Sequence, residues 1–236
     1  MAESKRHKVF ISFQHGCEDT VHLCGTKTVN TYFGLPTNFS MCNGSCGRNG
    51  VGLYQMHSQC RYYHKCGHYW KERFEYLMST STDKMISKAV GDGDIRTDIA
   101  TETIRQKIRD EFIADASVTV VLIGPETWKR KHVDWEISSS IRDTKNNPRC
   151  GLIGILLPTY PNYDSIKNTY NGKTIPPRLQ KNIDCGFATI HVWNENPAIV
   201  ANWIHNAFER RDKMNPDNSY PMFANNRPDN QTQWQS

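Results

Sequence analysis

Five short apolar runs constrain the fold of this chain more than any other feature of its sequence. They are 8–13 (KVFISF), 83–90 (DKMISKAV), 117–124 (SVTVVLIG), 151–158 (GLIGILLP) and 187–193 (FATIHVW). Each has the length of a β-strand, is rich in Val, Ile or another apolar residue, and is bounded by turn residues. Runs of this kind are typical of strands that are covered on both faces.

Segments with helical spacing lie between most of these runs, and we expect their apolar stripes to pack into the core. The stripes are Trp70, Phe74, Leu77 and Met78; Ile99, Ile104, Ile108 and Phe112; Trp135, Ile137 and Ile141; and Ile199, Val200, Trp203, Ile204, Ala207 and Phe208. Strands that alternate with helices predict right-handed crossovers and a parallel sheet with helices on both faces. We therefore expect an α/β fold with a five-stranded, flavodoxin-like sheet of order 2-1-3-4-5.

In such a sheet, ligands bind at the carboxyl ends of the strands, near the switch point between strands 1 and 3. The residues after Phe13 and after Gly124 should therefore share one rim of the sheet.

The chain of 236 residues is long enough for one sizeable core, and two segments interrupt the alternating pattern. We predict one domain over 7–213, with an insertion at 16–68 that is rich in Gly, Asn and Thr and contains most of the cysteines. Residues 214–236 are Asn- and Pro-rich without periodicity, so we expect an irregular or disordered C-terminal tail, although Tyr220, Met222 and Phe223 could dock on the domain.

Charge and hydropathy exclude several classes of protein. The net charge of +5 comes from 29 basic and 24 acidic residues spread along the chain, with no long basic block, so we expect no nucleic-acid partner. The N-terminus makes a poor signal peptide, and no apolar run approaches the ~18–20 residues of a membrane span. We therefore expect a cytoplasmic protein that does not enter a membrane.

Several segments together resemble the TIR-like domain family that includes the Thoeris ThsB defence proteins of bacteria. They are VFISFQH, YWKERFEYLM, TETIRQKIRDEFI, SVTVVLIGPETWKRKHVDWEIS and GLIGILLP, and the resemblance covers roughly 7–15 and 68–210. The most specific stretch is TVVLIGPETWKRKHVDWEI, because TIR domains present their NAD-cleaving glutamate after a strand and turn, in W-x-x-x-E or WC-x-x-E spacing. Aligned in this way, Glu136 falls on the catalytic glutamate of the family, and His132 stands where the family often has Trp.

A lone carboxylate suits the chemistry that this resemblance implies. Cleavage of the bond between ribose and nicotinamide in NAD builds positive charge on the ribose, which a preorganised anion stabilises. The alternative is that Glu136 lies in the first turn of a helix and complements its dipole, or pairs with Arg130 or Lys131.

Other residues are expected to bind substrate, each with a structural alternative. The resemblance places an aromatic residue near Phe13 in the pocket, where its ring could stack on a flat base, although strand alternation also makes it a core residue. His15 could contact the phosphates or ribose of NAD or be structural. Asp94 lies in a loop that contacts ligand or a neighbouring subunit in TIR domains, or is simply solvated. Trp135 or Trp128 would support the pocket.

The insertion contains a cluster of soft metal ligands. Cys42, Cys46, Cys60, His64 and Cys66 offer more than the four ligands that a tetrahedral zinc site needs, although no CxxC pair is present. The cluster predicts either a structural zinc site, which would order a segment with little core of its own, or free thiols in a loosely ordered loop.

The resemblance implies an NAD nucleosidase or ADP-ribosyl cyclase of anti-phage defence. It would release nicotinamide and make an ADP-ribose-derived signal, such as a cyclic ADP-ribose isomer, that activates a separate effector. The active form would be a homo-oligomer, and a phage component could be the trigger. The main alternative is a non-catalytic TIR-like module that assembles with partners. A phosphoryl-transfer receiver is disfavoured, because the first strand runs into Phe13-Gln14-His15 without paired acidic residues.

Overall fold

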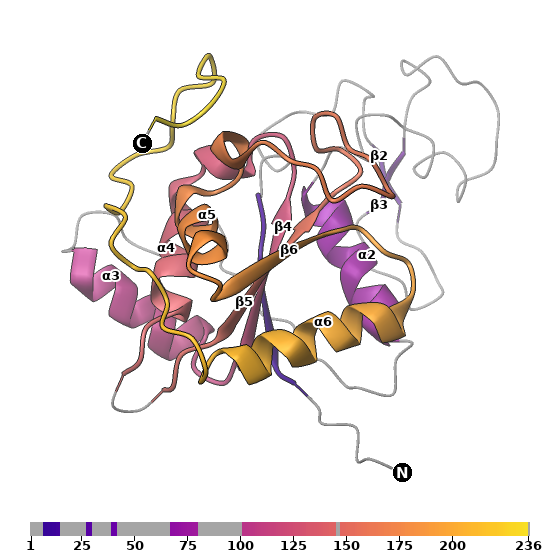
Figure 1. Cartoon of the computed structure of the whole chain (residues 1–236). Helices are drawn as coiled ribbons and strands as arrows, with labels where there is room; N and C mark the ends of the chain where they lie inside the picture. Colours follow the sequence, from indigo (N-terminus) through magenta and orange to yellow (C-terminus); the bar gives the residue numbers. More distant parts are fainter. Residues whose placement is uncertain are drawn as a thin grey trace, which may run out of the picture.

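The computed structural model describes residues 7–14, 27–29, 39–41, 67–79, 101–144 and 147–235. At its centre is a parallel sheet of four strands, flanked by helices on both faces (Figure 1). The strands are β1 (Val9–Ser12), β4 (Val118–Ile123), β5 (Gly151–Leu156) and β6 (Ala188–Val192), in the order β1-β4-β5-β6. All neighbouring pairs are parallel, and the register places Ser12 beside Val121 at the carboxyl end of β1.

The α/β class and the parallel sheet are therefore confirmed, but the predicted strand count and order are not. The described sheet has four strands rather than five, in the order β1-β4-β5-β6 rather than 2-1-3-4-5. The expected second strand, 83–90, lies outside the described residues. Its sequence has Lys84, Ser87 and Lys88 among the apolar residues, so its hydrophobic signal is weaker than that of the four strands.

Helices cover the two faces of the sheet as separate layers (Figure 1). One layer consists of α2 (Gly67–Ser79) and α6 (Pro197–Arg210). The other consists of α3 (Thr101–Lys107), the π-helical turn η2 (Ile108–Phe112) that continues it, α4 (Lys131–Ser140) and α5 (Pro177–Asp184).

Alternation along β1 explains how one strand contributes to both layers. Ile11 and Phe13 pack with Phe74 of α2 and Ile204 of α6, whereas Phe10 packs on the opposite face among residues of α3, η2 and α4. Successive strand residues point to opposite faces, so Ser12 lies on the same face as Phe10, toward α4. Most of the predicted helical stripes are buried as expected, although Ile199 is exposed and Ile99 lies outside the described residues.

Within the predicted insertion, the structure describes only two short strands and the start of α2. β2 (Lys27–Val29) and β3 (Phe39–Met41) form an antiparallel pair. All five proposed metal ligands of the insertion lie outside the described residues.

The C-terminal segment after α6 is irregular and packs on the domain (Figure 1, yellow). It runs past α5 and α4 to η3 (Thr127–Lys129) and ends near η4 (Gly172–Thr174). Phe223 and Trp234 are its buried side chains. In the part of the chain that the structure describes, none of the helices combines the length and the hydropathy that crossing a membrane requires.

Candidate functional site

Glu136 lies on α4 and faces the carboxyl end of β1. The side chain is 1% exposed, and Ser12 Oγ donates a hydrogen bond of 2.5 Å to Glu136 Oε2. Ser12 is the last residue of β1, and it is itself fully buried. The carboxylate is therefore held at the edge of the sheet where ligands bind in folds of this kind.

His132 provides a second link between α4 and the same end of β1. Its Nε2 lies 3.2 Å from the carbonyl oxygen of Phe13. A carbonyl only accepts hydrogen bonds, so this contact requires a proton on Nε2. Residues four apart lie on the same face of a helix, so His132 and Glu136 both reach β1 from one side of α4. His132 thus connects α4 to the backbone at the position where the related family often has Trp.

A short turn between β4 and α4 sets where this helix begins. The backbone N–H of Gly124 donates to Thr127 Oγ1 (2.9 Å), and the same hydroxyl donates to the Leu122 carbonyl (3.4 Å). Trp128 follows, 2% exposed, with Lys129 Nζ 5.3 Å from its ring centroid. Trp128 is therefore a packing residue of the turn, and its role in supporting a substrate pocket stays a prediction.

The structure brings together only some of the predicted site residues. Phe13 is 1% exposed and packs in the core between the sheet, α2 and α6. Trp135 turns away from β1, because its Nε1–H donates to the Phe223 carbonyl (2.8 Å) and its ring packs near Phe10. His15 and Asp94 lie outside the described residues.

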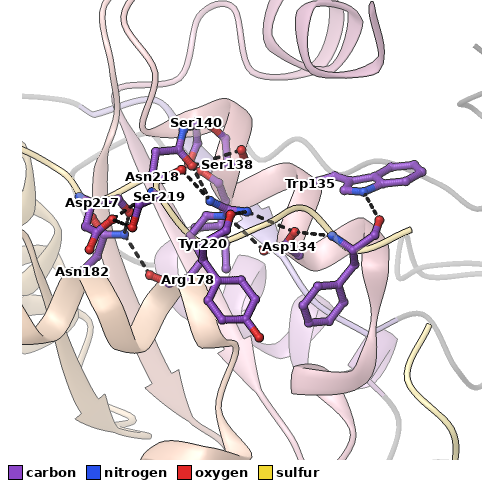
Figure 2. A network of polar contacts seen from close by, with 12 residues as sticks. Asp134, Trp135, Ser138, Ser140, Arg178, Asn182, Asp217, Asn218, Ser219 and Tyr220 are labelled. Carbon is purple, nitrogen blue, oxygen red and sulfur yellow. Dashed lines mark hydrogen bonds and ion pairs between the residues drawn. The ribbon is translucent and has the colours of Figure 1, made fainter. Parts of the chain in front are cut away.

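A buried ion pair on the other side of α4 escaped sequence reasoning. Arg178 of α5 donates to both carboxylate oxygens of Asp134, with Nε–Oδ1 and Nη2–Oδ2 distances of 2.9 and 3.3 Å (Figure 2). Both side chains are almost completely buried. Burial raises the pKa of Asp134, and Arg178 opposes that shift. The two residues are 44 positions apart, so no local pattern predicts the pair.

The Asp134–Arg178 pair continues into the C-terminal segment (Figure 2). The guanidinium also donates to Asn218 Oδ1 (2.6 Å) and to the Tyr220 carbonyl (2.7 Å), while the Phe223 N–H donates to Asp134 Oδ2 (3.1 Å). Every described donor and acceptor in this cluster therefore has a partner, as a buried charge pair requires.

The carboxylate of Glu136 is oriented by the hydroxyl of Ser12. Within the described ranges, no three His, Cys, Asp or Glu side chains are grouped so that they could hold a metal ion. A carboxylate fixed by a neighbouring hydroxyl can stabilise a developing positive charge without a metal.

Comparison with protein families gives a match to part of the chain. Residues 56–162 match the family model described as Thoeris protein ThsB, TIR-like domain. This range runs from the end of the predicted insertion past β5 and includes Glu136 and its helix. Neither the curated proteins nor the solved structures yielded a match. Residues 56–162 of the chain therefore resemble the TIR-like domain of the Thoeris protein ThsB.

Proposed function

We propose that this protein is an NAD-cleaving enzyme of bacterial anti-phage defence, with Glu136 as its catalytic carboxylate. The observation that supports this most directly is the placement of Glu136. It lies in the segment that matches the ThsB model, at the carboxyl end of β1, with its carboxylate fixed by Ser12.

The proposed chemistry needs one anion and no separate acid. The bond between ribose C1 and the nicotinamide nitrogen breaks, and its electron pair neutralises the positive ring nitrogen. Glu136 would stabilise the resulting oxocarbenium-like ribose. A water oxygen then bonds to C1 and loses a proton, which gives ADP-ribose, or a nucleophile of the same molecule does so and gives a cyclic isomer. NAD is the substrate, and free nicotinamide is one product in either case.

The remaining features of this proposal come from the resemblance to Thoeris proteins. The ADP-ribose-derived product would be a signal for a separate effector. Activity would require assembly into a homo-oligomer and a phage-derived trigger. The five Cys and His residues of the insertion, Cys42, Cys46, Cys60, His64 and Cys66, remain a candidate structural zinc site, and their chemistry does not enter the reaction.

One observation favours a second candidate function. Glu136 is only 1% exposed, so NAD can reach its carboxylate only if the residues that cover it move away. If such an opening never occurs, the domain would act as a non-catalytic assembly module.

The test compares NAD consumption by the wild type with that of Glu136→Gln. Products are resolved by mass spectrometry, with and without lysate from phage-infected cells. Glu209→Gln is the matched control, because Glu209 lies on α6 and pairs with Lys213 at 3.6 Å. We expect nicotinamide release by the wild type and the control and none by Glu136→Gln. If assembled and triggered wild-type protein releases no nicotinamide, the assembly module becomes the better account.

A further inference from the structure

We infer that the C-terminal segment 215–235 is a strap that positions α4, and through it Glu136, for catalysis. The inference rests on the proposed role of Glu136, but the strap itself is visible in contacts along the whole helix. Its residues would be positioning residues, because they act on the reaction through α4 and not by touching substrate.

The strap runs antiparallel to α4. Asn218 exchanges hydrogen bonds with Ser138, since Ser138 Oγ donates to Asn218 Oδ1 (3.1 Å) and Asn218 Nδ2 donates to the Ser138 carbonyl (3.0 Å). Further along the strap, the backbone of Phe223 makes two hydrogen bonds with α4. Its N–H donates to Asp134 Oδ2, and its carbonyl accepts from Trp135 Nε1–H. The residue numbers of the strap thus rise as those of α4 fall.

The same track continues past the start of the helix. Asn226 Oδ1 accepts from the Lys131 N–H (2.8 Å), the Arg227 N–H donates to the Lys129 carbonyl (2.8 Å), and Lys129 Nζ donates to the Asp229 carbonyl (2.7 Å). Contacts therefore follow α4 over its full length and extend into η3.

The strap also caps the N-terminus of α4, which its own N-cap residue does not do. The first N–H groups of a helix have no partner within the helix, and Ser, Thr, Asp or Asn at the N-cap usually satisfies one of them. At the N-cap of α4 stands Arg130, whose side chain makes no capping bond. Instead, the N–H of the first helical residue, Lys131, bonds to Asn226 from a segment 95 residues away in sequence.

Both ends of the strap are fixed to other elements. Near its start, Asn182 of α5 donates to the Asp217 carbonyl (2.7 Å) and accepts from the Asp217 N–H (3.0 Å) (Figure 2). Near its end, the Trp234 Nε1–H bonds to the carbonyls of Gly172 and Ile175, both at 3.0 Å. Because the strap is held at both ends and crosses α4, it restricts the movement of this helix.

Helical geometry connects this constraint to the candidate site. Asp134 and Glu136 are two residues apart, so their side chains leave α4 about 200° apart around its axis. The strap and Arg178 hold the Asp134 side, and Glu136 extends from the other side to Ser12. A shift of the strap would therefore move the Glu136 carboxylate relative to β1.

The test uses Asn218→Ala and Asn226→Ala in the full-length chain, with Asn226→Asp as the conservative variant that keeps an acceptor for the cap. Val200→Ala on α6 is the stability control, because it removes buried side-chain volume on the opposite face of the sheet. Hydrogen exchange is measured for amides of 131–140 and 197–210, and kcat and KM for NAD are measured well below the melting temperature of each variant.

We expect amides of 131–140 to exchange about fivefold faster in Asn226→Ala, which is the factor that a lost N-cap predicts. Exchange should also be faster in Asn218→Ala, which loses the bonds to Ser138, and should stay at the wild-type rate in Asn226→Asp and Val200→Ala. kcat should fall about tenfold in the Ala variants with KM nearly unchanged, as misplacement of a catalytic group predicts. Unchanged exchange over 131–140 overturns the strap, as does a fall in kcat no larger than that of Val200→Ala. If Glu136→Gln turns over NAD normally, the proposed function fails, and hydrogen exchange still decides whether the strap holds α4.

Discussion

At the residue scale, the contact between Ser12 and Glu136 is the feature most specific to the candidate site. Ser12 is the one polar residue of β1, where every side chain is buried, and a buried hydroxyl requires a hydrogen-bond partner. Its partner is the carboxylate to which we assign catalysis. A catalytic group has to be held close to its productive geometry, and neighbouring hydrogen bonds provide part of that orientation.

Replacing Ser12 with Ala should lower kcat for NAD about tenfold, because the Glu136 carboxylate loses the donor that orients it. Ser12→Thr keeps the hydroxyl and should retain most of the activity. Steady-state kinetics on both variants measure the effect. A Ser12→Ala enzyme with wild-type kcat would show that the 2.5 Å contact has no catalytic role.

His191 predicts a pH dependence of stability. Burial lowers the pKa of His191 to about 4, and the nearby charge of Arg210 makes a smaller contribution. The imidazole ring stacks on Trp203, with 4.2 Å between the ring centroids. Between pH 6.5 and about 4 the unfolded chain therefore binds a proton that the folded chain does not, so stability falls as pH falls through this window. His191→Phe keeps an aromatic ring against Trp203 and removes the group that binds this proton.

Urea unfolding at pH 7 and pH 4.5 measures this difference. The wild type should lose more stability than His191→Phe between the two pH values. An equal loss in both proteins would show that His191 does not contribute to it.

The sequence predicted part of the site at this scale. Glu136 was predicted as the catalytic residue from the resemblance of its strand-and-turn segment to TIR domains, which is a local signal. Ser12 was missed because its partner is 124 residues away, and a serine at the end of an apolar run gives no sign of what it faces. Trp135 was predicted to bind substrate, but its indole is turned toward a tail whose position no periodic pattern reveals.

At the scale of elements, α4 is held between β1 and the C-terminal strap. Two side chains join it to β1, and the buried Asp134–Arg178 pair joins it to α5 and the strap. Removing one partner of a buried ion pair leaves an uncompensated charge, whereas removing both leaves an apolar contact.

Arg178→Met should therefore lower the free energy of unfolding by ~3–5 kcal/mol, because Asp134 stays buried without its counter-ion. The double variant Asp134→Leu, Arg178→Met should recover much of that loss. Urea denaturation of the three proteins at pH 7 gives the values. A single variant within about 1 kcal/mol of the wild type would contradict the structural role of the pair.

Periodicity predicted the elements that bury an apolar face, and it could not predict the strap. Four of the five expected strand runs are strands, and the stripes of α2 and α4 pack in the core. The strap forms neither helix nor strand, and many of its bonds join side chains to distant backbone groups. Such contacts depend on the folded arrangement of α4, α5 and η3, so the sequence predicted only an irregular or disordered tail whose Tyr220, Met222 and Phe223 could dock on the domain.

At the scale of the whole molecule, the described parts form a parallel sheet between two helical layers, with the candidate site at the carboxyl end of β1. The strap crosses the layer that carries α4 and α5. The layer formed by α2 and α6 lies on the other face, so variants there serve as controls.

The proposed function depends on the Glu136 carboxylate, which would drive cleavage of the bond between ribose and nicotinamide. The most direct measurement follows free nicotinamide by proton NMR in assembled, triggered samples of wild type and Glu136→Gln, with NAD binding measured in the same samples. We predict that both proteins bind NAD and that only the wild type releases nicotinamide. Release at the wild-type rate by Glu136→Gln would contradict it.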